Sequence, residues 1–183
     1  MNNCFFLKLW LLILAVLFIP QTAFCDPVKT DAEKKKTVYE MYDVYKKDFP
    51  AVEDMSPQEA MNLMAEGRVV FVDVRKPAER KVSKLPYTVT KEEFIENPSK
   101  FKSKTVVTYC TISYRSGKFA MNMEKKGIRM YNLKGGVLAW VLEGGKVFDE
   151  NGQTNRVHVY GEKWNYLPEG YEAVRFGFFE KYF

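Results

Sequence analysis

One cysteine that ends an apolar run is the residue most able to do chemistry in this chain. Residues 105–110 (TVVTYC) predict a buried strand that ends on Cys110, and residues 116–127 predict a helix shortly after it. Arg115 lies in the loop between them, five positions after the cysteine. The N–H groups of such a loop can form an anion-binding nest, to which the helix N-terminus and the arginine add positive charge. These features favour a thiolate, so we expect Cys110 to be a nucleophile for an anionic, electrophilic substrate.

The spacing between Cys110 and Arg115 separates two chemistries that use a thiolate in such a loop. A phosphatase attacks a phosphoryl group and must hold three equatorial oxygens, whereas a sulfurtransferase attacks a sulfane sulfur and holds a smaller cysteine persulfide. Four residues lie between the cysteine and the arginine, and phosphate-binding cysteine loops typically have one more. The shorter loop favours sulfur chemistry. The structural alternative is a cysteine that serves only as a small buried hydrophobic residue, and the loop and the arginine argue against it.

The first 25 residues predict a signal peptide (1–25). An apolar run over residues 9–19 is followed by a polar stretch in which Ala23 and Cys25 suit a signal peptidase. The run is shorter than the roughly 20 residues of a membrane span, so we expect an exported protein, periplasmic or secreted, with no membrane anchor after cleavage. An uncleaved anchor is the alternative. Cleavage would leave Cys110 as the only cysteine, which excludes an internal disulfide.

Composition predicts a packed domain and argues against several kinds of site. Of 183 residues, 46% are hydrophobic and 15% aromatic, as in a chain with a core. The net charge of +5 is spread along the chain, so we expect no nucleic-acid partner. His158 is the only histidine, which argues against a Cys/His metal site or a Ser-His-Asp triad, and we expect no cofactor. Because His158 alternates with Val157 and Val159, we interpret it as structural.

Strands alternate with helices along the remaining sequence. We expect helices within residues 31–47, 56–67, 90–98, 116–127 and 135–145, and strands within residues 68–75, 105–110 and 129–133. This alternation predicts an α/β fold, a parallel sheet with helices on both faces. Ligands of such sheets bind at the carboxyl ends of the strands, where Cys110 lies.

The predicted elements divide the chain into four parts. After the signal peptide (1–25) come an N-terminal helical extension (26–55) and the α/β domain (56–149). Residues 150–183 form an aromatic C-terminal extension that we expect to pack on the domain.

Residues from about Ser56 to Val147 resemble a rhodanese (thiosulfate sulfurtransferase-like) domain. The matching pieces, in order, are FVDVRKPAE, VVTYCTISYRSG, KKGI and YNLKGGVLAWV. The resemblance implies a five-stranded parallel sheet and a Cys110 that cycles through a persulfide. One departure is the stretch VSKLPYTVTKEEF, where family members commonly have a Gly-His-Ile signature. This departure affects the expected shape of the opening of the site, and therefore which sulfur donor the site admits.

Carried over residue by residue, the resemblance assigns roles to ten positions. Cys110 is the sulfur acceptor, and Arg115 holds or attracts the anionic donor. Asp73, Arg75 and Glu79 are implied to brace the ends of the sheet. The persulfide-binding loop comprises Thr111, Ile112, Ser113, Tyr114, Arg115 and Ser116. Whether Tyr114 shields this loop from water or helps to select the donor stays open.

We therefore expect a sulfurtransferase that works by double displacement. The Cys110 thiolate attacks the outer sulfur of thiosulfate or a persulfide donor, and the enzyme persulfide then passes its sulfur to cyanide or a thiol. The alternative is a catalytically weak rhodanese-type module that binds a partner protein or a sulfur carrier. A phosphatase or arsenate reductase is the third class, against which the loop spacing argues. The sequence predicts no particular protein partner.

Overall fold

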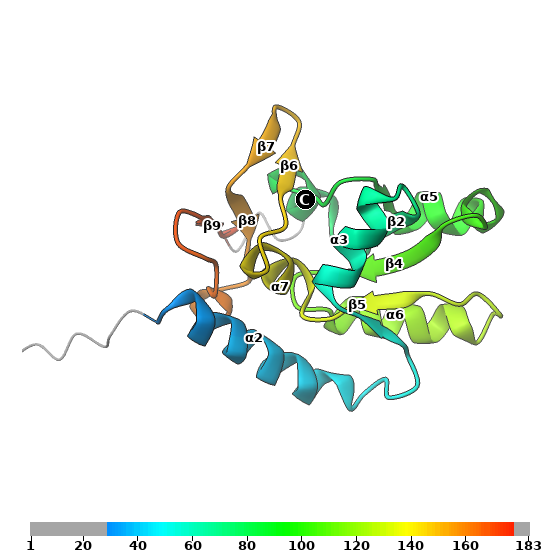
Figure 1. The fold of residues 1–183 in the computed structure, drawn as a ribbon, viewed down its shortest axis with the longest axis horizontal. Coiled ribbons are helices and arrows are strands. Elements are labelled where there is room, and N and C mark those ends of the chain that lie inside the picture. Colours follow the sequence, from blue (N-terminus) through cyan, green and yellow to red (C-terminus); the bar gives the residue numbers. More distant parts are fainter. Residues whose placement is uncertain (1–28, 178–183) are drawn as a thin grey trace, which may run out of the picture.

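Five parallel strands form the central sheet of the computed structural model, which describes residues 29–177 (Figure 1). Every neighbouring pair is parallel. The strand order is β1 (Asp54–Met55), β5 (Tyr131–Leu133), β4 (Thr105–Tyr109), β2 (Val69–Asp73) and β3 (Thr88–Thr90). The predicted α/β fold is thus confirmed, and β4, which ends just before Cys110, lies in the middle of the sheet.

Strand β2 shows why this sheet is covered on both faces. All five of its residues are buried, and four of them are β-branched or aromatic, types that pack well on a pleated surface. Phe71 belongs to one hydrophobic cluster and its neighbour Val72 to a second. Because successive side chains of a strand point to opposite faces, each face has its own core.

Helices cover the two faces in pairs. α3 (Pro57–Ala65) and α7 (Gly136–Leu142) contribute to the cluster of Phe71, and α5 (Lys91–Glu96) and α6 (Tyr114–Glu124) to that of Val72. α4 (Pro77–Val82) follows β2, and a 3₁₀ turn, η1 (Pro98–Phe101), follows α5. Two of these helices begin at the predicted positions, each with a capping box: Ser56 with Glu59 caps α3, and Thr90 with Glu93 caps α5.

The N-terminal extension packs along α6 and α7 at one side of the sheet (Figure 1). Its helix α2 (Asp31–Lys46) buries Val38 and Tyr42 completely. Phe49 then lies so close to Gly117 of α6 that a Cβ there would meet its ring at 2.3 Å. The sheet itself begins inside this segment, because β1 precedes residue 56, the predicted start of the domain.

Two small sheets lie at the end of the domain and in the described part of the C-terminal extension. β6 (Val147–Asp149) and β7 (Gly152–Thr154) make an antiparallel hairpin, and β8 (Arg156–His158) pairs in parallel with β9 (Glu172–Val174) around the 3₁₀ turn η2 (Glu162–Trp164). Val157 and Val159 are fully buried in the same cluster as α7. This extension therefore packs into the core of the domain.

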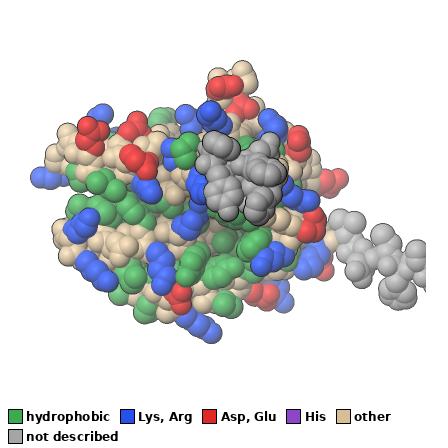
Figure 2. All heavy atoms as spheres, turned by 180° about the vertical axis from the view of Figure 1, so that it is seen from behind, with side chains coloured by type: hydrophobic (Ala, Val, Ile, Leu, Met, Phe, Trp, Pro, Cys, Tyr) green, Lys and Arg blue, Asp and Glu red, His purple; other side chains and the backbone are tan. Residues whose placement is uncertain are grey.

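The surface of the described residues has a mixed character. On the face shown in Figure 2, Lys and Arg side chains are scattered among acidic and hydrophobic ones. Within residues 29–177, none of the helices has the length and apolar composition needed to cross a membrane. The predicted signal peptide, residues 1–25, lies outside the described residues.

Candidate active site

Cys110 lies at the carboxyl end of the central strand, and the segments that follow the neighbouring strands meet it there. Only 2% of the residue is exposed. The turn after β2 leads to α4, and the glycine turn after β5 leads to α7. The N–H of Val74, which follows β2, donates to the carbonyl of Tyr109 (3.2 Å), so the ends of the two strands stay aligned.

The loop after Cys110 is held by its carbonyl groups. The N–H of Val137 donates to the carbonyl of Cys110 (3.0 Å), and that of Leu138 donates to the carbonyl of Thr111 (3.2 Å). Within residues 29–177, the N–H groups from Thr111 to Ser116 have no hydrogen-bond acceptor. A ligand beside Cys110 therefore has access to a series of unpaired donors at a helix N-terminus, an arrangement that favours an anion.

Helix α6 begins at Tyr114, and the predicted start near Ser116 is wrong. The reason is Ser113, whose φ of 67° lies in the left-handed region. Its hydroxyl donates to the carbonyl of Leu133, and its carbonyl accepts from Nδ2 of Asn132 at 3.1 Å. These bonds to β5 stabilise a conformation that a serine rarely adopts. Tyr114, Arg115 and Ser116, predicted as loop residues, thus form the first helical turn.

The glycine turn before α7 permits this close approach. Gly136 has a φ of 62°, and a Cβ there would lie 2.4 Å from the carbonyl oxygen of Cys110 and 2.7 Å from that of Thr111. Any other residue would push the loop away from α7. The glycine turn before α7 thus also sets the position of the cysteine loop.

The guanidinium of Arg115 is paired with a buried carboxylate. Nη1 and Nη2 donate to the two oxygens of Glu79, each at 2.9 Å. The guanidinium carbon also lies 5.1 Å from the ring centroid of Tyr160. Arg115 borders the site as the sequence predicts, but its charge is offset by Glu79, so the backbone N–H groups are the donors free to bind an anion.

A cavity of about 490 Å³ adjoins Cys110. Thr111 contributes to its wall, and the Oγ1 atom of this residue is buried with no hydrogen-bond partner in residues 29–177. Four aromatic side chains also line the cavity: Tyr45, Tyr114, Tyr160 and Trp164. Among residues 29–177, the cavity included, no three His, Cys, Asp or Glu side chains gather as a potential metal site. The arrangement is that of a buried thiol followed by a loop of unpaired N–H groups, beside an aromatic cavity.

Residues 56–143 match the family model of the rhodanese-like domain. The chain contains a rhodanese-like domain. The resemblance seen in the four sequence motifs is thereby confirmed, and the five-stranded parallel sheet that it implies is present. The match ends before the C-terminal extension and begins after α2, so both extensions lie outside the matched residues.

Similar proteins include one curated relative and several solved structures. An uncharacterised protein of Synechocystis sp. is 31% identical over 94 residues, which are 49% of this chain and 52% of that protein. This chain therefore spans about half the length of that relative. A crystal structure from Bacillus halodurans is 25% identical with a TM-score of 0.47, covering 62% of this chain and 87% of that one. The polysulfide-sulfur transferase homodimer of Wolinella succinogenes is 23% identical with a TM-score of 0.44, covering 67% and 95%.

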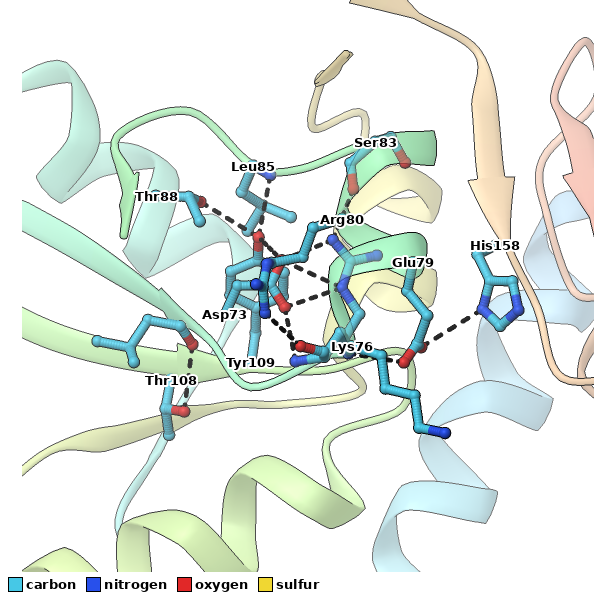
Figure 3. A network of polar contacts seen from close by, with 12 residues as sticks. Asp73, Lys76, Glu79, Arg80, Ser83, Leu85, Thr88, Thr108, Tyr109 and His158 are labelled. Carbon is cyan, nitrogen blue, oxygen red and sulfur yellow. Dashed lines mark hydrogen bonds and ion pairs between the residues drawn. The ribbon is translucent and has the colours of Figure 1, made fainter. Parts of the chain in front are cut away.

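Glu79 joins the rhodanese-like domain to the C-terminal extension. Besides Arg115, its carboxylate accepts from the backbone N–H of Lys76 (2.9 Å) and from the hydroxyl of Tyr160 (2.9 Å). Nδ1 of His158 lies 3.4 Å from Oε1 of Glu79 (Figure 3). Burial would raise the pKa of Glu79, but the contact with His158 and the hydrogen bonds from Arg115 outweigh it and hold this pKa below its usual value.

The sequence did not indicate this polar cluster. Glu79 was expected to brace the sheet and His158 to be structural, and neither was linked to Arg115. The contacts span 36 residues from Glu79 to Arg115 and 81 from Glu79 to Tyr160. No periodic pattern or short motif connects positions so far apart. The sequence offered two hints of this cluster: the glutamate at the end of the motif FVDVRKPAE and the histidine flanked by apolar residues.

The change Glu79→Gln should weaken the fold most at neutral pH. The uncharged amide cannot pair with Arg115, which we expect to cost about 1–3 kcal/mol. Because the folded-state pKa of Glu79 is lowered, the ionised carboxylate stabilises the wild type above its ordinary pKa of 4.5, and this stabilisation is lost as the pH falls. The free energy of unfolding, measured with urea from neutral to acidic pH, should therefore differ less between variant and wild type in acid than at neutral pH.

The exposed residue Glu150 offers a control, since Glu150→Gln should change the free energy of unfolding at neutral pH by no more than about 0.5 kcal/mol. A constant difference between Glu79→Gln and the wild type at every pH would contradict the role given to the ionised carboxylate.

Asp73 (Figure 3) and Arg75 form a second buried network, and neither of them lines the cavity. Arg75 donates from Nε and Nη2 to the carboxylate of Asp73 at 2.9 and 2.7 Å. The hydroxyl of Tyr109 donates to the same carboxylate (2.7 Å), and the carbonyl of Ser83 accepts from Arg75 Nη2 (2.6 Å). These bonds join the carboxyl ends of β2 and β4 to the end of α4.

Proposed function

We propose that this protein is a sulfurtransferase that moves a sulfane sulfur from thiosulfate or a persulfide donor to a thiophilic acceptor. The observation that carries the proposal is the set of unpaired N–H groups from Thr111 to Ser116, in the segment that directly follows the one cysteine of the described residues. The rhodanese-like domain supports the same chemistry at the level of the family. The proposed acceptor of the sulfur is the Cys110 thiolate.

The reaction consists of two displacements at sulfur. In the first, the Cys110 thiolate attacks the outer sulfur of the donor, the donor S–S bond breaks, and sulfite or a thiolate leaves with the bonding electron pair. The terminal sulfur of the resulting persulfide carries the negative charge, and the loop N–H groups donate to it. In the second, cyanide or a thiolate attacks that terminal sulfur, and Cys110 leaves as the thiolate. No metal or redox partner is needed for this balance.

The pairing of Arg115 favours sulfur over phosphorus. A phosphoryl group places charge on three equatorial oxygens, which a phosphatase meets with backbone donors and a free arginine. Here both ends of the guanidinium are bound by Glu79. The terminal sulfur of a persulfide is a single anionic atom, which the backbone donors can satisfy without the arginine.

The test is turnover by the purified protein with thiosulfate and cyanide, measured as thiocyanate, beside hydrolysis of an aryl phosphate. We expect catalysed thiocyanate formation and no phosphate release above the uncatalysed rate. Phosphate release without thiocyanate would contradict the proposal. A protein inactive with thiosulfate and with a small persulfide donor would instead point to the binding module.

We further propose that the protein is exported after removal of residues 1–25, on the basis of the apolar run and the small residues at positions 23 and 25. N-terminal sequencing of the protein isolated from its host should then begin at Asp26. Retention of Met1 would contradict this.

The change Gly136→Ala should strongly reduce sulfur transfer. Its Cβ would meet the carbonyl oxygens of Cys110 and Thr111, so the loop must shift by several tenths of an ångström or more. A displacement of about 1 Å in a reacting group lowers a rate by about 10²-fold, and we expect a loss of kcat/KM of this order. Gly67→Ala is the matched control, because Gly67 has a φ of 66° but nothing within 4 Å of its Cβ position. Equal losses in the two variants would refute the role of the close contact.

A further inference from the structure

The cavity beside Cys110 is larger than the smallest sulfur donor requires. Its volume is about 490 Å³, within the roughly 300–1,000 Å³ that bury an organic ligand of moderate size. Thiosulfate is a compact ion built around a single sulfur–sulfur bond, and in such a cavity it would leave most of the wall without contact. The wall therefore has room for the body of a larger donor.

Three of the four aromatic side chains in the cavity wall come from the two extensions rather than from the rhodanese-like domain. Tyr45 belongs to α2, and Tyr160 and Trp164 belong to the C-terminal extension. From the domain, Tyr114 adds a fourth ring, which lies 5.3 Å from the ring of Tyr45 between centroids. The rings of Tyr160 and Trp164 form a T-shaped pair with centroids 5.9 Å apart. Residues distant in sequence thus converge on one aromatic surface.

The polar atoms of two of these side chains are already engaged. The hydroxyl of Tyr160 donates to Glu79 (2.9 Å), and that of Tyr114 donates to Asp48 (3.0 Å). Both hydroxyls therefore bond to protein groups. The part of each side chain that a ligand can contact is its aromatic ring. An aromatic surface of this kind binds apolar, planar groups most favourably, because their burial contributes the most binding free energy.

The anionic end of a donor has its own partners near the sulfur. The N–H groups from Thr111 to Ser116 are unpaired, and the buried hydroxyl of Thr111 lacks a partner in residues 29–177. Lys76 also lines the cavity. The positive charge of Arg115 is offset by Glu79, so a small dianion gains less from this arginine than the sequence alone suggests.

We propose that the two extensions make the site selective for sulfur donors that have an anionic sulfur head and an apolar body of aromatic size. This inference rests on the proposed sulfur transfer and adds the class of donor. For an aryl thiosulfonate, the Cys110 thiolate attacks the outer sulfur, the S–S bond breaks, and the aryl sulfinate leaves with the electron pair. The products are the Cys110 persulfide and one sulfinate anion, so charge and atoms balance. The aryl group packs against Tyr45, Tyr160 and Trp164.

The experiment compares two donors with the same head group, benzenethiosulfonate and methanethiosulfonate, with cyanide as the acceptor. The wild type should show a kcat/KM at least about 10-fold higher for the aryl donor, since even one methylene in an apolar pocket is worth about 10-fold or more. Trp164→Ala and Tyr45→Ala should each lower this ratio severalfold. Val44→Ala is the matched control, because Val44 adjoins Tyr45 on α2 but is 61% exposed and outside the cavity; its ratio should equal that of the wild type.

The outcomes separate the two proposals. A wild-type ratio near one, or an unchanged ratio in both aromatic variants, would overturn the donor preference while leaving sulfur transfer in place. Failure of thiosulfate and of both thiosulfonates to load Cys110 would overturn sulfur transfer itself. The wild-type ratio alone decides the donor preference if a variant does not fold.

Discussion

The change Cys110→Ser should abolish sulfur transfer and leave the protein folded. Serine has nearly the shape of cysteine, but its hydroxyl is not ionised at neutral pH and forms no stable persulfide equivalent. Loss of a catalytic nucleophile typically lowers turnover by 10³-fold or more, so we expect thiocyanate formation to fall by at least about 10³-fold. The measurement is steady-state turnover with thiosulfate and cyanide.

Folding of this variant must be established independently. Cys110 is 2% exposed, and a serine hydroxyl there costs about 1–3 kcal/mol if it finds no partner. Cys110→Ala is a second variant, which avoids the buried hydroxyl. Thermal unfolding should show one cooperative transition for both. A folded Cys110→Ser protein with substantial turnover would contradict a role for the thiolate.

The change Asp73→Asn should produce the largest loss of stability among single polar substitutions in the described residues. It removes the charge that faces Arg75 while both side chains are 0% exposed. Breaking a buried ion pair by removing one partner costs about 3–5 kcal/mol, because the remaining charge is left without compensation. The amide group also replaces one acceptor oxygen by a donor, so either the guanidinium, which has no acceptor, or the hydroxyl of Tyr109 loses an acceptor for its proton. Urea unfolding measures the difference directly.

Glu66 and Arg68 provide a matched control for this prediction. They are likewise two residues apart and 2.7 Å from one another, but they are exposed by 54% and 65%. A surface pair of this kind contributes about 0–1 kcal/mol, so Glu66→Gln should change the free energy of unfolding by no more than that. Similar losses in the two variants would contradict the account in which burial decides the cost.

Much of the fold was predictable because local signals agree with the tertiary structure. The capping box of Ser56 and Glu59 begins α3 where the sequence indicates, and the apolar run from Val69 to Asp73 forms a strand buried on both faces. Strong local signals of this kind survive in the folded state because packing reinforces them. The short strands β1 and β3 were missed as separate predictions, since two or three residues carry no measurable period.

In the candidate site, the central cysteine and its arginine could be singled out from the sequence, but the groups around them could not. Cys110 and Arg115 stand out by type and spacing, but the left-handed Ser113, which sets the helix start, depends on bonds to β5. The pairing of Arg115 with Glu79 likewise depends on tertiary packing. The contribution of both extensions to the cavity also depends on tertiary packing, because Tyr45 and Trp164 lie outside the motifs that identify the domain. These contacts are non-local, and sequence periodicity reports only local structure.

The most direct test of the central claim is the intact mass of the purified protein before and after incubation with thiosulfate, and again after cyanide. The account predicts a gain of one sulfur atom, located on Cys110 by peptide mapping, lost with cyanide and absent in Cys110→Ser. An unchanged mass with thiosulfate, with benzenethiosulfonate and with a small persulfide donor would contradict a persulfide at this cysteine.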